Sequence, residues 1–564
     1  MNLDTSRRLI KKGSDAILLT LLEETEDKES PKVVKTATVN KRHNRQGRRQ
    51  RVIGKSRIIA HSKTKEEKDL EEEENTKTLT EGVDFAGVYG EIDVNEGTYL
   101  VYIKESRKVG RLNGKAVYEV LSCGSVCIDG LNDPMIQEML DDFFKIPGLF
   151  YSETDLSTAG THLEENTDFI YNYIPLSKYQ QNNPDAAVFG INVVQGYFGQ
   201  EYLSGKVEME CTIVSRRSWR NAGTRYYARG ADPNGDAANT VETLLIAKTK
   251  TETYEFIQCR GSIPLSWEQK INLSYKPPVK MGNSDLSRHL FMKHLNVLRK
   301  RYGKYMFITL LDEKGHEKEL NSEFTKSLQE TGCKYLAVDY HRMMKSAEEK
   351  KEFKKSLKDA LSHEVMLRTN CVDCLDRTNV VQSQLSKIKL VEMLGLEEES
   401  ENGSILDIDD YLNESSVKKL GQLWNSNANA LSMQYTGTSA LKNDLTEHGV
   451  RTFKGLIQDA ISSGKRYVNN NFTDGRMQEI IELVTGVRQT LGNCIRGDRR
   501  IGIYLVLVSI LIACLYKHSY YAGNAALACA VVSFRSVLAV YLSFPSPRKR
   551  VQGEKENEKV KKRE

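Results

Sequence analysis

Short stretches in which apolar and polar residues alternate are the main pattern between residues 83 and 168. Examples are "GTYLVYI", "GKAVYEVLS" and "SVCID", which are separated by turn-forming residues. A period of two is typical of β-strands that bury one face. We therefore predict a β-rich N-terminal subdomain over residues 1–170.

From about Asn172 the chain mixes two kinds of apolar pattern. The runs "KVEMECTIV", "YMFITLL" and "YLAVDY" predict strands, whereas "SRHLFMKHLNVLRKRYG" has the 3.6-residue period of an amphipathic helix. Strands that alternate with helices, without an internal repeat, indicate a larger α/β domain. We place this domain at residues 171–490 and expect it to carry the catalytic chemistry.

Two charged runs near the N-terminus have no apolar period. Residues 32–57 are strongly basic, and residues 66–74 are almost all acidic. Such runs are typical of solvated, disordered segments, so we predict a disordered insertion over about residues 23–80. A nucleic-acid-binding or nuclear-targeting role is the alternative, but a net charge of +5 over 564 residues does not indicate a nucleic-acid partner.

The C-terminal part contains two long apolar stretches. The first, Ile501–Tyr516, has no charged residue, and the second, Tyr520–Phe544, is interrupted by Arg535. A membrane-spanning helix needs about 20 apolar residues. We predict a two-helix transmembrane hairpin within residues 491–550, with spans at about 500–517 and 520–544, and leave a buried helical hairpin as the alternative.

Basic residues flank the predicted hairpin on both sides. Short basic flanks stay on the cytosolic side of a membrane. The expectation is therefore a cytosolic catalytic domain, two cytosolic termini and a cytosolic tail over residues 551–564. The ten cysteines have no paired zinc-ligand spacing and fit reduced thiols in the cytosol. No metal site and no cofactor are predicted.

The segment "RTNCVDCLDRTNVVQ", Arg368–Gln382, combines thiols, carboxylates and guanidinium groups in a few positions. Before it, "EVMLRTN" predicts a strand that ends at Asn370. After it, one apolar helix face begins near Thr378. The residues between them, Cys371–Arg377, therefore form a strand-to-helix turn, where free amide N–H groups favour a bound phosphate and a thiolate.

The residue types in this turn suit attack on phosphorus. An ionised cysteine, Cys371, is a strong nucleophile, and Arg377 offers a planar fork for phosphate oxygens. Thr378 is placed to donate a hydrogen bond to the thiolate. The alternatives are a redox pair formed by "CVDC", half of a metal site, and a chance occurrence of cysteine and arginine six positions apart.

The segment also resembles, essentially residue for residue, the hallmark loop of the Sac-domain phosphoinositide phosphatases. Further stretches resemble the same family, including "SRRSWRNAGTRYYARGADPNGDAANTVET", "QCRGSIPLSWEQ", "LWNSNANALSMQYTGTSALKNDLTEHGVRT" and "GKRYVNNNFTDG". The likeness covers about Glu81–Val484. The long polar insertion, and "YNYIP" where the family favours a tryptophan, depart from the family pattern. The resemblance implies an α/β catalytic domain of the Cys-x5-Arg phosphatase type behind a β-rich N-terminal Sac subdomain.

This resemblance implies a metal-independent hydrolysis in two steps. Cys371 would form a phosphocysteine while Arg377 and the loop amides hold the phosphate oxygens. Asp376 is preferred over Asp373 as the general acid, and a structural role for either carboxylate stays open. The residues expected to line or orient the substrate site are Val372, Cys374, Leu375, Thr378, Asn379 and Arg225. Of these, Thr378 and Asn379 would orient the loop, Cys374 would mainly pack, and Arg225 belongs to a basic cluster with Arg216, Arg217 and Arg229.

The two apolar C-terminal stretches resemble the membrane-anchored branch of that family, which acts at the endoplasmic reticulum and Golgi. That likeness implies phosphatidylinositol 4-phosphate as the first substrate and an endoplasmic reticulum membrane location with cycling to the Golgi. The chain ends "KVKKRE", where Lys561 and Lys562 resemble a dilysine signal read by coat-protein retrieval machinery. The alternative functions are a protein tyrosine phosphatase and a weakly catalytic membrane tether or lipid-binding scaffold.

Overall fold

The computed structural model describes most of one compact unit, residues 1–489. Within it, residues 83–489 are described apart from short gaps at 96, 130–131, 154–155, 157–166, 275, 341–345, 398, 401–402 and 442–452. Before residue 83, the backbone of three strands is described. The predicted transmembrane hairpin and the tail with Lys561 and Lys562 lie outside the described residues.

A small antiparallel sheet precedes the main body. Its strand order is β3-β2-β1-β4, with bounds Lys32–Asn40, Ala16–Glu23, Ser6–Lys12 and Val83–Asp84. Strand β3 lies inside the stretch expected to be disordered, so that expectation is wrong for these residues. The run "KVVKTATVN" alternates apolar and polar positions closely enough to pair with β2.

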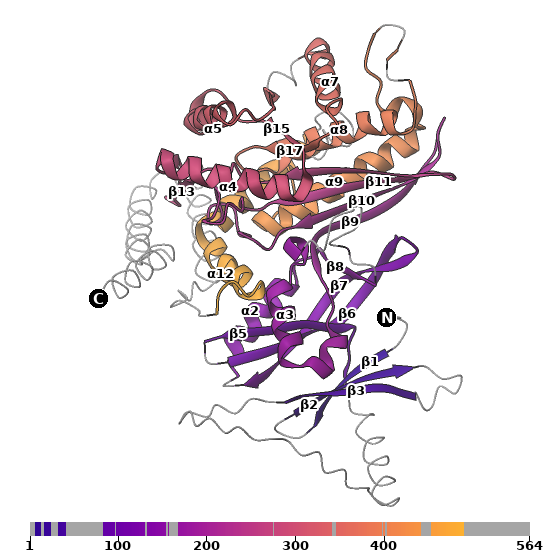
Figure 1. Cartoon of the computed structure of the whole chain (residues 1–564), viewed down its shortest axis with the longest axis vertical. Helices are drawn as coiled ribbons and strands as arrows, with labels where there is room; N and C mark the ends of the chain where they lie inside the picture. Colours follow the sequence, from indigo (N-terminus) through magenta and orange to yellow (C-terminus); the bar gives the residue numbers. More distant parts are fainter. Residues whose placement is uncertain are drawn as a thin grey trace, which may run out of the picture. The chain divides into compact units, whose positions relative to one another are not determined.

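One eleven-stranded mixed sheet organises the rest of the unit (Figure 1). Its order is β16-β15-β17-β12-β11-β10-β9-β8-β7-β6-β5. The strands, in chain order, are β5 Gly87–Val94, β6 Gly97–Leu112, β7 Lys115–Asp129, β8 Leu149–Ser152, β9 Val194–Leu203, β10 Met209–Arg217, β11 Val241–Lys248, β12 Thr253–Arg260, β15 Tyr305–Thr309, β16 Tyr335–Ala337 and β17 Met366–Asn370.

The sheet changes character along its width. Strands β5 to β12 pair antiparallel with their neighbours, whereas β12, β17, β15 and β16 pair in parallel. Parallel neighbours require long connections, which here are helices. The ends of these strands are therefore the place where loops from distant parts of the sequence meet.

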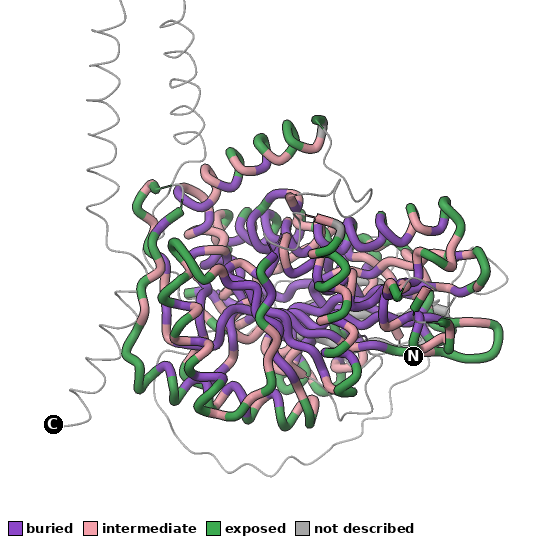
Figure 2. The backbone as a smooth tube through the Cα atoms, turned by 90° about the horizontal axis from the view of Figure 1, so that it is seen from above, coloured by how far each residue is buried: buried purple, intermediate pink, exposed green. Residues whose placement is uncertain are grey.

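Helices cover both faces of the parallel end. One apolar cluster joins the sheet to α7 (Ala347–Leu361), α8 (Asp376–Met393) and α9 (Glu414–Thr436). A second cluster joins the sheet to α4 (Ser284–Tyr302) and α5 (Lys318–Glu330). Figure 2 shows the sheet strands buried and the exposed residues on the outer turns of the helices. This half is an α/β sandwich, in agreement with the sequence pattern.

The remaining helices complete the unit. Against the antiparallel end lie α2 (Pro134–Phe144) and α3 (Tyr173–Asn182). After α9 the chain forms α11 (Phe453–Val468), a π-helical turn at Asn469–Thr473 and α12 (Asp474–Val484). A two-stranded ladder pairs β13 (Trp267–Gln269) with β14 (Val279–Met281).

The boundary expected near residue 170 falls within a continuous sheet. Strand β8, before this boundary, pairs with β9, after it, through Leu149 with Gln195 and Phe150 with Val194. The β-rich half and the α/β half are therefore joined by main-chain hydrogen bonds. Among the described residues, no helix is long and apolar enough to cross a membrane.

Candidate active site

The turn that connects β17 to α8 forms the centre of the candidate site. Strand β17 is buried along its whole length between β12 and β15, so the turn starts from a fixed position. Helix α8 begins at Asp376 and buries Val381, Leu385 and Val391 against the sheet. The strand, turn and helix expected from the sequence are all present, and the helix begins two residues earlier than expected.

The Cys371 side chain is buried and receives two hydrogen bonds at its sulfur. Its exposed fraction is 2%. The backbone N–H of Cys374 donates to Sγ at 2.8 Å, and the hydroxyl of Thr378 donates at 3.3 Å. Burial raises the pKa of Cys371, but hydrogen bonding from Cys374, the charge of Arg377 and the Thr378 hydroxyl together lower it to about 6. The thiolate therefore predominates at neutral pH.

Cys374 has the opposite properties. Burial, and then the neighbouring Cys371 sulfur, raise the pKa of its thiol well above the ordinary value. The thiol donates to the carbonyl of Gly261 at 2.8 Å. Its backbone lies in the left-handed region, at φ 53°, which is uncommon for a residue other than glycine. This conformation turns the Cys374 N–H toward the Cys371 sulfur, so Cys374 supports the thiolate rather than competing with it.

Arg377 lies among acceptors from the loop that follows β15. Its Nη2 donates to Oε1 of Glu317 at 2.7 Å, and its Nη1 donates to the Leu310 carbonyl at 3.0 Å. The carboxylate of Asp312 is 3.4 Å from Nη1. Burial disfavours the guanidinium charge, but Cys371 and Glu317 outweigh burial and raise the pKa of Arg377. Two carboxylates and a carbonyl thus fix the orientation of this side chain.

Sequence reasoning did not identify Glu317 or Asp312 as site residues. Both lie in "LLDEKGHEKE", at the carboxyl end of a parallel strand next to β17. Polar residues at that position in an α/β sheet are the signal that could have identified them.

Asp373 is held by two arginines. Arg225 approaches both carboxylate oxygens, at 3.1 and 2.5 Å, and Arg229 donates to Oδ1 at 2.6 Å. Burial raises the pKa of Asp373, but the two guanidinium groups lower it far below the usual range. The carboxyl group is therefore ionised at all working pH values, which opposes the general-acid role considered for it.

The four arginines of the basic cluster differ in how exposed they are. Arg225 keeps 17% of its side chain exposed at the turn. The other three arginines are buried, and Arg216 pairs with Glu242 in the core. Buried guanidinium groups cannot contact a membrane surface, so Arg225 is the member of this cluster that keeps exposed surface at the turn.

Asp376 contacts residues that lie outside the turn. Its Oδ1 accepts the backbone N–H of Leu441 at 2.7 Å, and its Oδ2 lies 3.2 Å from Nη1 of Arg466 on α11. These contacts suit the structural role that the sequence left open. Asp376 therefore connects the turn to α11, and its part in proton transfer stays a prediction.

The other predicted substrate-site residues differ in burial. Thr378 and Asn379 are buried, and the Asn379 side chain donates to the Trp424 carbonyl at 3.2 Å. Val372 and Leu375 are each 8% exposed, on the turn itself. Thr378 and Asn379 are thus enclosed by protein, and their role in orienting the loop stays a prediction.

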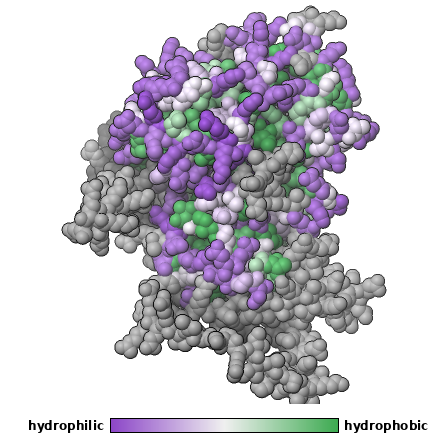
Figure 3. All heavy atoms as spheres, viewed as in Figure 1, coloured by the Kyte–Doolittle hydropathy of each residue, from purple (hydrophilic) through white to green (hydrophobic). Residues whose placement is uncertain are grey.

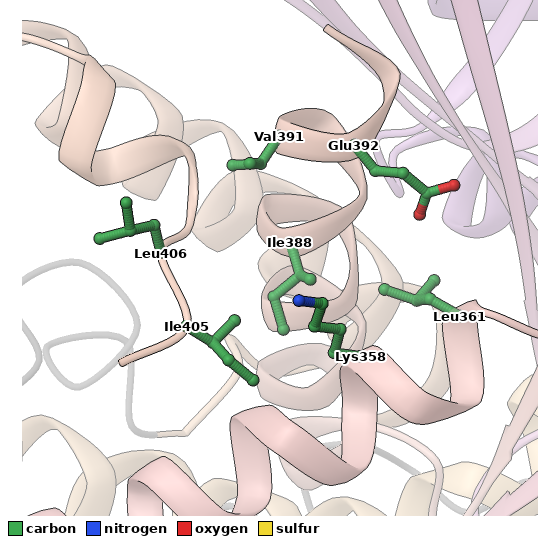
Figure 4. Close-up of a pocket in the computed structure, with 7 residues that line it drawn as sticks. All are labelled: Lys358, Leu361, Ile388, Val391, Glu392, Ile405 and Leu406. Atoms are coloured by element: carbon green, nitrogen blue, oxygen red, sulfur yellow. The ribbon is translucent and has the colours of Figure 1, made fainter. Parts of the chain in front are cut away.

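Small pockets lie near α8 in the described part of the chain. One adjoins the turn and is lined by Arg217, Asn239, Val241, Arg260, Asp373, Cys374, Leu375, Leu431 and Tyr435. Another lies between α7 and α8 and is lined mainly by aliphatic side chains such as Ile388 and Leu361 (Figure 4). Its polar groups are Lys358 and Glu392, and it contains no residue of the turn.

Comparison with known proteins identifies the family. Residues 86–345 match the SacI homology domain. The chain is 34% identical over 452 residues to phosphatidylinositol-3-phosphatase SAC1-B of Danio rerio, covering 71% of this chain and 75% of that protein. It is 32% identical over 451 residues to phosphoinositide phosphatase SAC6 of Arabidopsis thaliana, covering 71% and 74%. It is 28% identical over 489 residues to phosphatidylinositol-3-phosphatase SAC1 of Saccharomyces cerevisiae, covering 77% of each.

Residues 86–345 include strands of both the antiparallel and the parallel parts of the sheet. The family match and the named relatives confirm the resemblance noted from the turn motif. The protein therefore belongs to the SacI homology domain family.

Proposed function

We propose that this protein is a phosphoinositide phosphatase that works through a phosphocysteine intermediate. The observation that carries the proposal is the environment of Cys371, whose buried thiol lies in the turn between β17 and α8 and has a pKa lowered to about 6. The relatives with comparable coverage are named as phosphoinositide phosphatases. A buried, ionised thiol beside an arginine is the arrangement that cysteine-dependent phosphate transfer requires.

The proposed reaction has two steps. In the first, the Cys371 sulfur bonds to phosphorus, the bond from phosphorus to the inositol oxygen breaks, and that oxygen takes up a proton. In the second, water attacks the phosphocysteine, which releases inorganic phosphate and restores the thiol. Arg377 and the backbone N–H groups of the turn would stabilise the negative charge on the phosphate oxygens.

Asp376 remains our proposed proton donor for the inositol oxygen. Two arginines contact Asp373 and keep its carboxyl ionised, so it has no proton to donate. One arginine contacts Asp376. If Asp376 is the acid, Asp376→Asn should lower kcat at least about tenfold with little change in the melting temperature. A loss of thermal stability with an unchanged kcat would instead identify a purely structural residue.

The substrate class follows from the family, and the preferred ring position is a narrower proposal. Two of the relatives above are named as 3-phosphatases, while we predict preference for phosphatidylinositol 4-phosphate. The test is phosphate release by the full-length protein from vesicles that contain the 3-, 4- or 5-monophosphate. A kcat/KM for the 4-phosphate below that for the 3-phosphate would contradict the preference without affecting the reaction class.

Cys371→Ser tests the reaction class itself. A serine hydroxyl at this position has no base to ionise it, so we expect loss of turnover by a factor of at least 1,000, as an order of magnitude. The melting temperature should change little, because the oxygen is smaller than sulfur and accepts the same hydrogen bonds. Appreciable lipid phosphatase activity in this variant would exclude the proposed nucleophile.

We also propose the domain division and location drawn from the sequence. The β-rich subdomain would cover residues 1–170, the catalytic domain 171–490, the transmembrane hairpin 491–550 and the cytosolic tail 551–564. The support is the apolar sequence of the two stretches and their basic flanks. Resistance of the full-length protein to alkaline carbonate extraction would test the anchor. Replacing Lys561 and Lys562 with serine should release a tagged protein from the endoplasmic reticulum if the tail is read by coat proteins.

A further inference from the structure

Helix α11 presents its apolar side chains to solvent. The exposed fractions are 79% for Phe453, 50% for Leu456, 49% for Ile457 and 48% for Ile461. Spacings of three, four and eight residues place these side chains on one stripe of the helix. In an ordinary surface helix, such a stripe faces the core. Here the stripe faces outward, which requires an explanation.

Exposed apolar residues that occur singly on a surface need no special explanation. The face shown in Figure 3 has small apolar patches between polar residues, as most protein surfaces do. The stripe on α11 differs because its four members are large, lie along one helix and follow the helical period.

The polar side of α11 attaches the helix to the protein. Ser462 is 4% exposed and Arg466 is 5% exposed. Arg466 donates to the Ser432 hydroxyl on α9 at 2.9 Å and to the Thr438 hydroxyl at 2.9 Å. Because these bonds fix the rotation of the helix about its axis, they also fix the outward direction of the apolar stripe.

The same arginine reaches the catalytic turn. Nη1 of Arg466 lies 3.2 Å from the carboxylate of Asp376, the residue immediately before Arg377. A displacement of α11 would therefore act on the turn through one ion pair.

Basic side chains lie on α11 and near its C-terminal end. Lys465 is exposed on α11 itself. Tyr467 donates to the carbonyl of Leu273 at 2.9 Å, which brings the end of α11 to the loop between β13 and β14. The side chains of Lys270 and Lys280, which begin and end this loop region, are 64% and 67% exposed and share one glutamate.

An apolar helical stripe with a basic rim is the pattern of helices that lie in the interface of a membrane. Anionic lipids attract such a rim. We propose that α11 docks on the bilayer that holds the lipid substrate, with Phe453, Leu456 and Ile457 entering the headgroup region, and that docking is communicated to the turn through Arg466 and Asp376. This inference rests on the proposed function, because a phosphoinositide substrate is presented by a bilayer.

Rates measured on two substrates, one monomeric and one in vesicles, distinguish an effect on docking from an effect on catalysis. The variant Phe453→Ser/Leu456→Ser/Ile457→Ser in the full-length protein should keep its kcat/KM on a monomeric, short-chain phosphatidylinositol 4-phosphate within twofold. On the long-chain lipid in anionic vesicles, kcat/KM should fall at least tenfold. The matched control is Leu286→Ser/Met292→Ser on α4, whose side chains are 45% and 46% exposed, and it should change neither rate.

A direct contact measurement accompanies the kinetics. In Phe453→Trp, brominated lipid in the vesicles should quench the added tryptophan fluorescence, whereas Leu286→Trp should not be quenched beyond the wild type. Arg466→Lys should reduce the rate advantage of vesicles over monomeric substrate while keeping the quenching of Phe453→Trp.

Each other result overturns the inference. Equal loss on both substrates would show that the stripe supports the fold. No loss on vesicles and no quenching would show that the bilayer does not contact α11. If the wild type hydrolyses neither substrate, the proposed function itself is wrong. That result can be told apart from failure of the docking inference alone, in which the wild type remains active.

Discussion

Replacing Thr378 with valine removes one hydrogen bond from the Cys371 sulfur and leaves the shape of the side chain almost unchanged. The hydroxyl donates to Sγ at 3.3 Å, and Thr378 is completely buried. Valine therefore fills the same space without the donor. The variant measures how much of the lowered pKa of Cys371 depends on this single contact.

The size of the effect follows from the charge on the acceptor. A hydrogen bond to a charged group contributes about 1.5–3 kcal/mol. Since about 1.4 kcal/mol corresponds to a tenfold change, losing the bond should raise the pKa of Cys371 by about 1 to 2. Starting from about 6, the thiolate fraction at pH 6 would fall from about half to between roughly a tenth and a hundredth.

Two assays report this fraction. The acid limb of kcat/KM should move to higher pH, with a loss of about 5- to 50-fold at pH 6 and little loss at pH 9. The pH dependence of Cys371 alkylation by iodoacetamide should move in the same direction. The control is Thr485→Val, a buried threonine that donates within α12, remote from the turn. An unmoved acid limb with normal folding would refute the view that Thr378 stabilises the thiolate.

Three further predictions concern other groups of the site. Glu317→Ala should lower kcat/KM about 10- to 100-fold, because Arg377 loses a charge-assisted partner of about 1.5–3 kcal/mol and is no longer oriented. Mild peroxide should inactivate the enzyme and reductant should restore it, and Cys374→Ser should make the loss less reversible, because its thiol is the nearest partner for oxidised Cys371. Asp474→Asn should raise stability at pH 8 by up to about 4 kcal/mol and leave it unchanged at pH 4.

The sign of the Asp474 effect follows from its burial. The side chain is 4% exposed, and burial, opposed in part by Arg225, raises the pKa of its carboxyl to about 7. A carboxyl whose folded-state pKa is raised favours the folded state only while it is protonated, so stability is lost as the pH rises from about 4 through 7. Thermal unfolding measured from pH 4 to 8 should show a smaller decline in the asparagine variant, and parallel curves would contradict this account.

Controls for the remaining two predictions are available nearby. Glu319→Ala removes an exposed carboxylate from the same segment as Glu317 and should leave kcat/KM within twofold. Identical recovery from peroxide with and without Cys374 would show that this thiol only packs.

The sequence predicts the strand, turn and helix around Cys371 because these features are local. The apolar period of α8 and the position of Thr378 relative to Cys371 can be read within about ten residues. The partners that set the electrostatics cannot be read in this way. Glu317 is 60 positions from Arg377, and Arg225 is 148 positions from Asp373. Only the order of the strands brings such residues together.

The same limit explains the correction at β3. Strand β3 alternates weakly, and its charged residues hide that alternation until pairing with β2 is known. The burial of Arg216 and Arg217 cannot be read from the local sequence either. Their burial depends on acceptors such as Glu242 and Gln195, which come from neighbouring strands.

The narrow point of the sheet at β8 has a consequence for how the molecule unfolds. Strand β8 has four residues, and it pairs with β9 at only two positions. The antiparallel end has a core of its own around Phe85 and Phe189, and the parallel end has two cores of its own. A further cluster packs Leu112 and Phe150, before this point, against Leu244 and other residues after it. Side-chain packing in this shared cluster, more than the backbone pairing at β8, therefore couples the two halves. Regions that are weakly coupled open as separate cooperative units. A change that loosens the shared cluster should therefore let amide exchange in β5 and β6 proceed by an opening that leaves β15 and β17 protected, and so shorten the lifetime of the protein without touching its chemistry.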